Sequence, residues 1–170
     1  MNSPMFHPRV SKVTVNIGVG EGGERLAKAE TLLEQLTGQK AIKTFARESN
    51  QTFGIRQSTP IACKVTLRKE IADKFLLKVL ESLDNRIEKG NFDENGNLAF
   101  GIKEHIDIPG VKYDPAVGIF GMDVCLTLEN SGYRIKNRRF NKGKISKGHG
   151  LKKNDAIQFM KKKYALIIED

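Results

Sequence analysis

The sequence predicts an α+β fold in which helices pack on one face of an antiparallel sheet. Residues 10–19, 61–67 and 122–129 alternate between apolar and polar side chains, which is the period of a half-buried strand. Such strands bury one face of a sheet and expose the other, whereas the strands of a parallel sheet are apolar on both faces. Residues 24–37 and 69–83 repeat apolar side chains at helical spacing, so they are predicted to form the covering layer.

The remaining elements follow in chain order. Glycines at 20–23 turn the chain after the first strand, and Gly38 is placed to end the first helix. A short strand at 41–45 precedes residues 47–59, which are predicted to be a loop without structure of its own. The second half is predicted to contain a turn at 91–97, a strand at 98–102, a loop at 108–121, a helix capped by Asn154 and ending at Tyr164, and a last strand at 165–168.

The length of the chain fits one domain over residues 1–170, since 170 residues can enclose one well-buried core. No run of about eighteen apolar residues is present, so we expect no spanning helix and no membrane partner. The first residues lack the basic and apolar blocks of a signal peptide, which favours the cytoplasm. Cys63 and Cys125 are far apart in the sequence, so we expect reduced, buried thiols, no metal site and no cofactor.

The charge distribution points to a polyanionic partner. The chain carries a net charge of +9, and residues 131–163, the basic segment, hold twelve Lys or Arg and one acid. The net charge of the basic segment is +11, and that of the other 137 residues is −2. A charge run can be an ordinary solvated face. Because eleven uncompensated charges repel one another without a partner, binding to a polyanion such as RNA is favoured.

One motif is typical of nucleotide-binding proteins instead. Residues 18–23 read GVGEGG, a GxGxxG pattern between a strand and a helix, which in a dinucleotide fold holds a pyrophosphate. Glu21 and Glu24 place negative charge where a phosphate would sit, and the region about twenty residues on holds Lys40 and Lys43 instead of an acid. A nucleotide-binding role for this turn is therefore disfavoured.

Catalytic groups are not arranged in a recognisable pattern. His7, His105 and His149 have no serine, cysteine or carboxylate nearby in a nucleophile motif, and no metal-ligand spacing is present. We therefore expect no enzyme, and structural or surface roles for the histidines.

Two groups of residues are candidates for RNA contact. On the predicted strands, the side chains opposite the apolar set include Asn16, Lys64, Thr66 and Arg68, which can be an ordinary wet sheet face or part of an RNA surface. In the basic segment, cations alternate with glycines, and Tyr133 or Phe140 is free to stack on a base. The candidate cations of that segment are Arg134, Lys136, Arg138, Arg139, Lys142, Lys144 and Lys147.

Several segments, in collinear order over nearly the whole chain, resemble a known family. That family is the ribosomal protein that binds 5S rRNA in the central protuberance of the large subunit, in its archaeal and eukaryotic form. The matching segments are KVTVNIGVGE at 12–21, LTGQ at 36–39, FGIR at 53–56, PIACKVTLR at 60–68, GIKEHI at 101–106, YDP at 113–115 and GIFGMD at 118–123.

The resemblance implies a curved antiparallel sheet backed by helices and a structural, ribosome-bound role. By motif position, the implied 5S rRNA face includes Asn16, Gln39, Thr66 and Arg68. Residues 46–57 are similar to the loop that reaches the elbow of the P-site tRNA; its candidate contacts are Arg47, Phe53, Gly54, Ile55 and Arg56. Further implied partners are large-subunit rRNA, a neighbouring 5S-binding ribosomal protein and, through residues 109–121, the small-subunit head at an intersubunit bridge.

The sequence departs from bacterial members of that family. It lacks their N-terminal helix, its basic segment replaces a more acidic C-terminal helix, and Gly54 stands where they often carry a basic residue. Contacts of the basic segment therefore cannot be carried over from the bacterial branch. A free-standing RNA-binding module or assembly factor and a nucleotide-dependent enzyme are the alternative hypotheses.

Overall fold

The computed structural model describes residues 4–111, 113–115 and 117–169. Its main feature is a five-stranded antiparallel sheet in the order β2-β3-β1-β6-β5. The strands are β1 (Arg9–Gly18), β2 (Ile42–Phe45), β3 (Pro60–Leu67), β5 (Leu98–Ile102) and β6 (Met122–Glu129). The longer helices are α1 (Glu24–Thr37), α2 (Lys69–Ser82) and α4 (Lys153–Tyr164); α3 (Arg134–Asn137) and the 3-10 turns η1 (Pro4–Phe6), η2 (Lys89–Asn91) and η3 (His105–Asp107) are short. The predicted α+β class is confirmed.

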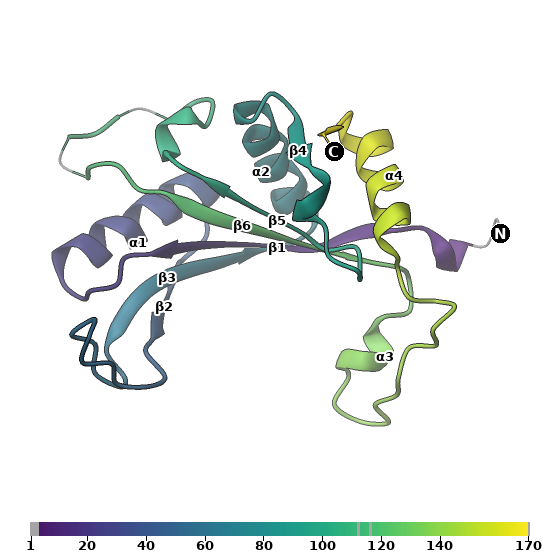
Figure 1. Ribbon diagram of the computed structural model, residues 1–170, viewed down its shortest axis with the longest axis horizontal. Helices are drawn as coiled ribbons and strands as arrows, with labels where there is room; N and C mark the ends of the chain where they lie inside the picture. The colour runs from purple at the N-terminus through teal and green to yellow at the C-terminus, as the bar shows by residue number, and fades with distance from the viewer. Residues whose placement is uncertain (1–3, 112, 116, 170) are drawn as a thin grey trace.

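The three longer helices, α1, α2 and α4, lie on one side of the sheet, and the other side is open (Figure 1). Along the central strand, Val13, Val15 and Ile17 are fully buried against the helix layer, and the residues between them point to the open side. The buried faces of α1 and α2 contribute leucines and Phe75 to the same core. The alternation read from the sequence thus gives the correct inner face of the sheet.

The α1 helix has the predicted boundaries, and its end has a clear cause. Gly38 adopts a left-handed conformation with φ 66°, and its N–H donates to the Glu34 carbonyl at 2.8 Å. A residue without Cβ enters this conformation at no steric cost, so the helix stops there.

Two features of the C-terminal part differ from the sequence-based expectations. β4 (Arg86–Glu88) was not predicted, and it pairs in parallel with β7 (Ile167–Glu169) as a separate two-stranded sheet. Asn154 was predicted to cap the last helix, but α4 begins at Lys153, and Lys152 occupies the cap position without a side-chain hydrogen bond. The cap prediction was wrong because Asn154 is the second residue of α4 and therefore lies past the cap position.

The two cysteines also differ in environment. Cys63 is buried on the helix side of β3, where burial chiefly, with the nearby charge of Glu30, raises the pKa of its thiol to about 11. Cys125 is exposed, because it alternates with buried Val124 and Leu126 and therefore faces the open side of β6. The expectation of two buried thiols was wrong for Cys125.

The C-terminal helix is tied to α2 by a polar contact. Asp73 accepts a hydrogen bond from the Lys163 ammonium at 2.8 Å and another from the Tyr164 hydroxyl. Burial opposes the charged form of Asp73, but the bonds from Lys163 and Tyr164 and the charge of Lys163 outweigh it and lower its pKa. Burial, together with the bond to Asp73, raises the pKa of Tyr164.

Replacing Asp73 by Asn is expected to lower the free energy of unfolding at neutral pH by about 1 kcal/mol, a value discounted for partial exposure. Because the folded pKa of Asp73 lies below its unfolded value, this stabilisation is full above the unfolded pKa of about 3.9 and is lost as pH falls through the folded pKa. Urea unfolding of both chains as a function of pH checks the expectation. An unchanged gap between the two chains in acid would contradict it.

Candidate nucleic-acid interface

The open face of the sheet carries short and basic side chains aligned across the strands. In the pairing of β1 with its neighbours, Asn16 lies between Lys64 and Asp123, and Thr14 lies between Thr66 and Cys125. Ile42, on the edge strand β2, continues the first row beyond Lys64. Since no helix covers these side chains, they form a platform that a partner can reach.

Among the predicted sheet residues, three are brought together directly. Lys64 and Thr66 are exposed on β3, and Asn16 is partly exposed beside them, with no hydrogen bond to its amide from the described part of the chain. Arg68 is exposed just past β3 in extended backbone, so alternation keeps it on the side of Thr66. Gln39 lies apart from these rows, in the connection between α1 and β2.

Residues 131–151 of the basic segment, the basic loop, are held at their base by hydrogen bonds. The Leu151 N–H donates to the Tyr133 hydroxyl at 2.8 Å. The His149 ring pairs with the Ser131 carbonyl at 2.7 Å, and the Asn130 amide donates to the His149 carbonyl at 3.1 Å. Tyr133 is thereby part of the framework of the loop, which leaves Phe140 as the candidate for base stacking.

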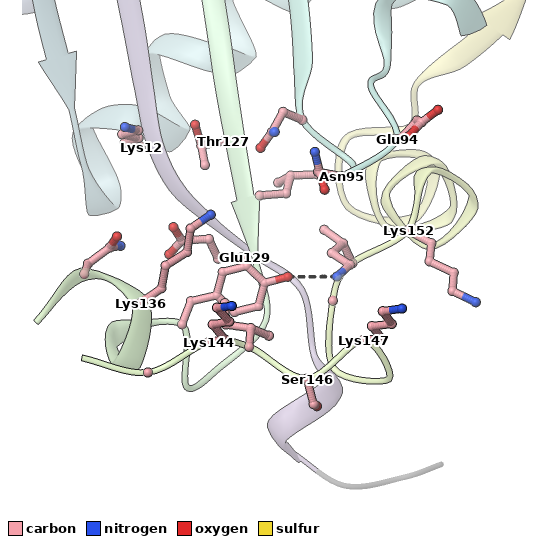
Figure 2. Close-up of a pocket in the computed structure, with 18 of the residues that line it drawn as sticks. Lys12, Glu94, Asn95, Thr127, Glu129, Lys136, Lys144, Ser146, Lys147 and Lys152 are labelled. Carbon is pink, nitrogen blue, oxygen red and sulfur yellow. Dashed lines mark hydrogen bonds between the residues drawn. The ribbon is translucent and has the colours of Figure 1, made fainter. Parts of the chain in front are cut away.

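A groove of about 1090 Å³ joins the basic loop to the open face. Figure 2 shows Lys12 and Thr127, a paired position on β1 and β6, on the sheet side of this groove, with the basic loop across from them. Within the described residues, its lysines form no salt bridge. The six lysines that line it are Lys12, Lys136, Lys142, Lys144, Lys147 and Lys152; the acids are Glu94 and Glu129. A surplus of unpaired ammonium groups in a groove suits the phosphates of a nucleic acid.

The other predicted cations lie outside the groove lining. Arg134, Arg138 and Arg139 are exposed on α3 and in the turn that follows it. Lys12, Thr14 and Lys152 were not predicted as site residues. Lys12 and Thr14 alternate with buried Val13 and could have been found from the same pattern that gave Asn16, whereas only the folded basic loop places Lys152 in the groove.

Residues 46–59 form the predicted loop between β2 and β3, and an isolated β-bridge folds it into an ordered arm, the hairpin arm. Asn50 and Ile55 exchange backbone hydrogen bonds at 2.7 and 2.9 Å, and the Ala46 N–H donates to the Thr59 carbonyl. Gly54, with φ 65°, sits in the tight turn at the tip. The predicted loop is confirmed, since no helix or strand lies between β2 and β3, and the short Asn50–Ile55 pairing gives it order that its polar residues do not reveal.

The hairpin arm presents its tip to solvent. Phe53 is 74% exposed and therefore lies outside the core, and Ile55 is half-buried. Arg47 and Arg56 are exposed near the base and tip. In Figure 1, the hairpin arm between β2 and β3 and the basic loop around α3 both project from the side of the sheet opposite the helices. The open face is therefore flanked by two projections.

In the glycine-rich turn at 18–23, backbone N–H groups that could bind a phosphate are hydrogen-bonded within the protein. The N–H groups of Val19 and Gly20 both donate to the Ile61 carbonyl, at 3.1 and 2.8 Å, so neither is available to a phosphate. Glu21 pairs with Arg25 at 3.7 Å. His105 is buried, and its Nδ1 accepts the Phe120 N–H at 3.3 Å, which is a structural role.

The described ranges contain neither a membrane-spanning helix nor a metal site. No helix there is long and apolar enough to cross a membrane, and no group of three or more His, Cys, Asp or Glu side chains could hold a metal ion. Of the proposed bridge surface at 109–121, residues 112 and 116 lie outside the described residues.

Comparison with known proteins gives one consistent result. Residues 60–159 match the model for the C-terminus of the ribosomal L5 family, and residues 3–56 match that of ribosomal protein L5. A protein of Methanosphaera stadtmanae named large ribosomal subunit protein uL5 is 52% identical over 97% of this chain and 98% of its own. Proteins of the same name from Methanobrevibacter smithii and Sulfurisphaera tokodaii are 52% and 50% identical, over 93% and 98% of this chain and 93% and 94% of their own.

These matches confirm the resemblance seen in the sequence. They also confirm that the chain is not an enzyme, because this family is structural. With both family models matched in order and relatives aligned nearly end to end, the chain belongs to the ribosomal protein L5 family.

Proposed function

We propose that this protein, a structural component of the large ribosomal subunit in the cytoplasm, attaches 5S rRNA to that subunit. One observation carries the proposal: the register of β3, β1 and β6 aligns Lys64, Asn16 and Thr66 on an uncovered face that continues through Lys12 into the lysine-lined groove. The relatives are named large ribosomal subunit proteins, which supports the same assignment.

The two parts of this surface suit different tasks. Short side chains such as Asn16, Thr14 and Thr66 let an RNA chain approach the sheet closely and offer hydrogen bonds of defined direction. The lysines of the groove are long and flexible, so they neutralise phosphates without fixing a sequence. The sheet therefore supplies selectivity, and the basic loop supplies most of the electrostatic affinity.

The proposal also includes partners that contact the edges of the molecule. The hairpin arm, with Arg47, Phe53, Gly54, Ile55 and Arg56, reaches the elbow of the P-site tRNA; its exposed tip supports this role. Residues 109–121 face the small-subunit head at an intersubunit bridge, where Tyr113 and Ile119 are exposed. Gln39 extends the 5S rRNA surface beyond β2, and large-subunit rRNA and a neighbouring 5S-binding protein complete the set of partners.

Substitutions on the sheet test the 5S rRNA assignment. Asn16→Ala or Thr66→Ala is expected to weaken binding of a 5S rRNA transcript by roughly 1–3 kcal/mol, because each removes a hydrogen bond made in a desolvated interface. The slope of affinity against salt should stay the same, since neither residue is charged. Filter binding at several salt concentrations measures both quantities. Wild-type affinity in both variants would remove the open face from the interface.

A free-standing RNA-binding assembly factor is the competing function, and its behaviour in cells differs. A resident ribosomal protein sediments with mature large subunits after a high-salt wash, whereas an assembly factor is found on precursor particles and leaves them. Absence from washed mature subunits would favour the assembly factor.

A further inference from the structure

The basic loop contains one tyrosine, Tyr133, and one phenylalanine, Phe140, and the structure assigns them different roles. The Tyr133 hydroxyl accepts the Leu151 N–H, and its ring lies 6.1 Å from that of His149, so it fastens the base of the loop. Phe140 is 75% exposed. An apolar ring of this size gains nothing for folding while it remains in water.

Phe140 is held in a defined turn beyond α3. The Arg138 Nε donates to the Asn141 carbonyl at 2.6 Å, and Asn141 adopts a left-handed conformation with φ 49°. The Gly143 N–H donates to the Ile135 carbonyl at 3.2 Å, which closes the turn onto α3. Phe140 therefore lies in a turn whose two ends are joined by hydrogen bonds.

The surroundings of the ring are those of a nucleic-acid contact. The guanidinium of Arg139 lies 5.3 Å from the centre of the Phe140 ring, close enough for a cation–π contact. On either side along the chain, Asn137 and Lys142 line the lysine-rich groove. A nucleic-acid backbone held in that groove would bring its bases within reach of the turn, and every base has a flat face that can stack on an exposed ring.

We propose that Phe140 is a base-stacking residue, which receives an unpaired base of the bound rRNA while the groove holds the adjoining phosphates. This inference rests on the proposed function, because it takes rRNA as the ligand of the groove. The nucleotide must be unpaired, since a base inside a duplex is already stacked on both faces. Arg139 keeps its cation–π contact with the same ring and pairs with an adjoining phosphate.

A tryptophan at this position gives a direct test, because the chain contains no Trp of its own. In the Phe140→Trp variant, addition of 5S rRNA transcript is expected to quench the indole fluorescence strongly, as base stacking does. The matched control is Leu77→Trp, which places the reporter on α2, in the helix layer away from the open face, at a side chain that is 54% exposed. The control should change little.

Affinity measurements on the same RNA complete the test. Phe140→Ala should weaken binding about tenfold, with an unchanged salt slope, because stacking releases no counterions. Phe140→Tyr should bind like the wild type. If the wild type binds the transcript but Phe140→Ala binds equally well and the indole of the Phe140→Trp variant is unquenched, the stacking role is wrong and the proposed function stands. If the wild type does not bind 5S rRNA, both proposals fail.

Discussion

Replacing Lys142, Lys144 and Lys147 together by alanine is expected to weaken binding to 5S rRNA on the order of a hundredfold at about 0.1 M salt. All three line the groove, and none forms a salt bridge within the described residues, so their charges are available to phosphates. Each lost phosphate contact should reduce the slope of log affinity against log salt by about 0.7–0.9, or by roughly two to three for the set.

The control removes the same number of charges from the other side of the molecule. Lys28, Lys74 and Lys78 lie on α1 and α2, in the helix layer away from the open face. Their replacement by alanine changes the net charge by the same amount and should leave the salt slope unchanged. Equal losses in both triple variants would mean that net charge alone, and not the groove, drives binding.

Exchange of residues 48–56 for a Gly-Ser linker is expected to speed release of P-site tRNA from assembled ribosomes by on the order of a hundredfold. This change removes the exposed ring of Phe53 and the charge of Arg56, and it dissolves the Asn50–Ile55 pairing that orients them. Stacking is worth about 1–3 kcal/mol per base, and a phosphate contact adds to it. Peptidyl-tRNA drop-off and tRNA dissociation rates measure the effect.

The same ribosomes should keep their 5S rRNA, because the open face and the basic loop are untouched by the exchange. Phe53→Ala alone should show part of the tRNA effect with the hairpin arm intact. If the exchanged particles instead lose 5S rRNA, and the intact ones hold tRNA normally, the hairpin arm acts in assembly.

The sequence predicted most of the sheet and helix layer because their signals are local. Alternation along 10–19 and 61–67 placed Val13 and Val65 inside and Asn16 and Thr66 outside, and Gly38 marked the end of α1. Each of these signals depends on a residue and its near neighbours only. β4 escaped prediction because three residues carry no period, and its partner β7 lies some eighty positions further along the chain.

Residue type alone could not distinguish local structures that have the same amino-acid composition. Residues 47–59 are polar in an ordered hairpin as they would be in a loose loop, since a hairpin arm surrounded by water has no apolar face to reveal it. From the sequence, Tyr133 and Phe140 were equal candidates for base stacking, since both are aromatic residues of the basic segment. Only the hydrogen bond from Leu151 to Tyr133 separates a framework residue from an exposed one.

By itself, the sequence determined the fold class, the family resemblance and the location of the surplus positive charge, because periodicity, motif order and charge counting need no knowledge of distant contacts. The tertiary structure alone decided that the basic loop lies across a groove from Lys12 and Thr127, and that the lysines converge on this groove. That convergence depends on contacts between residues more than a hundred positions apart, and no local pattern encodes such a distance.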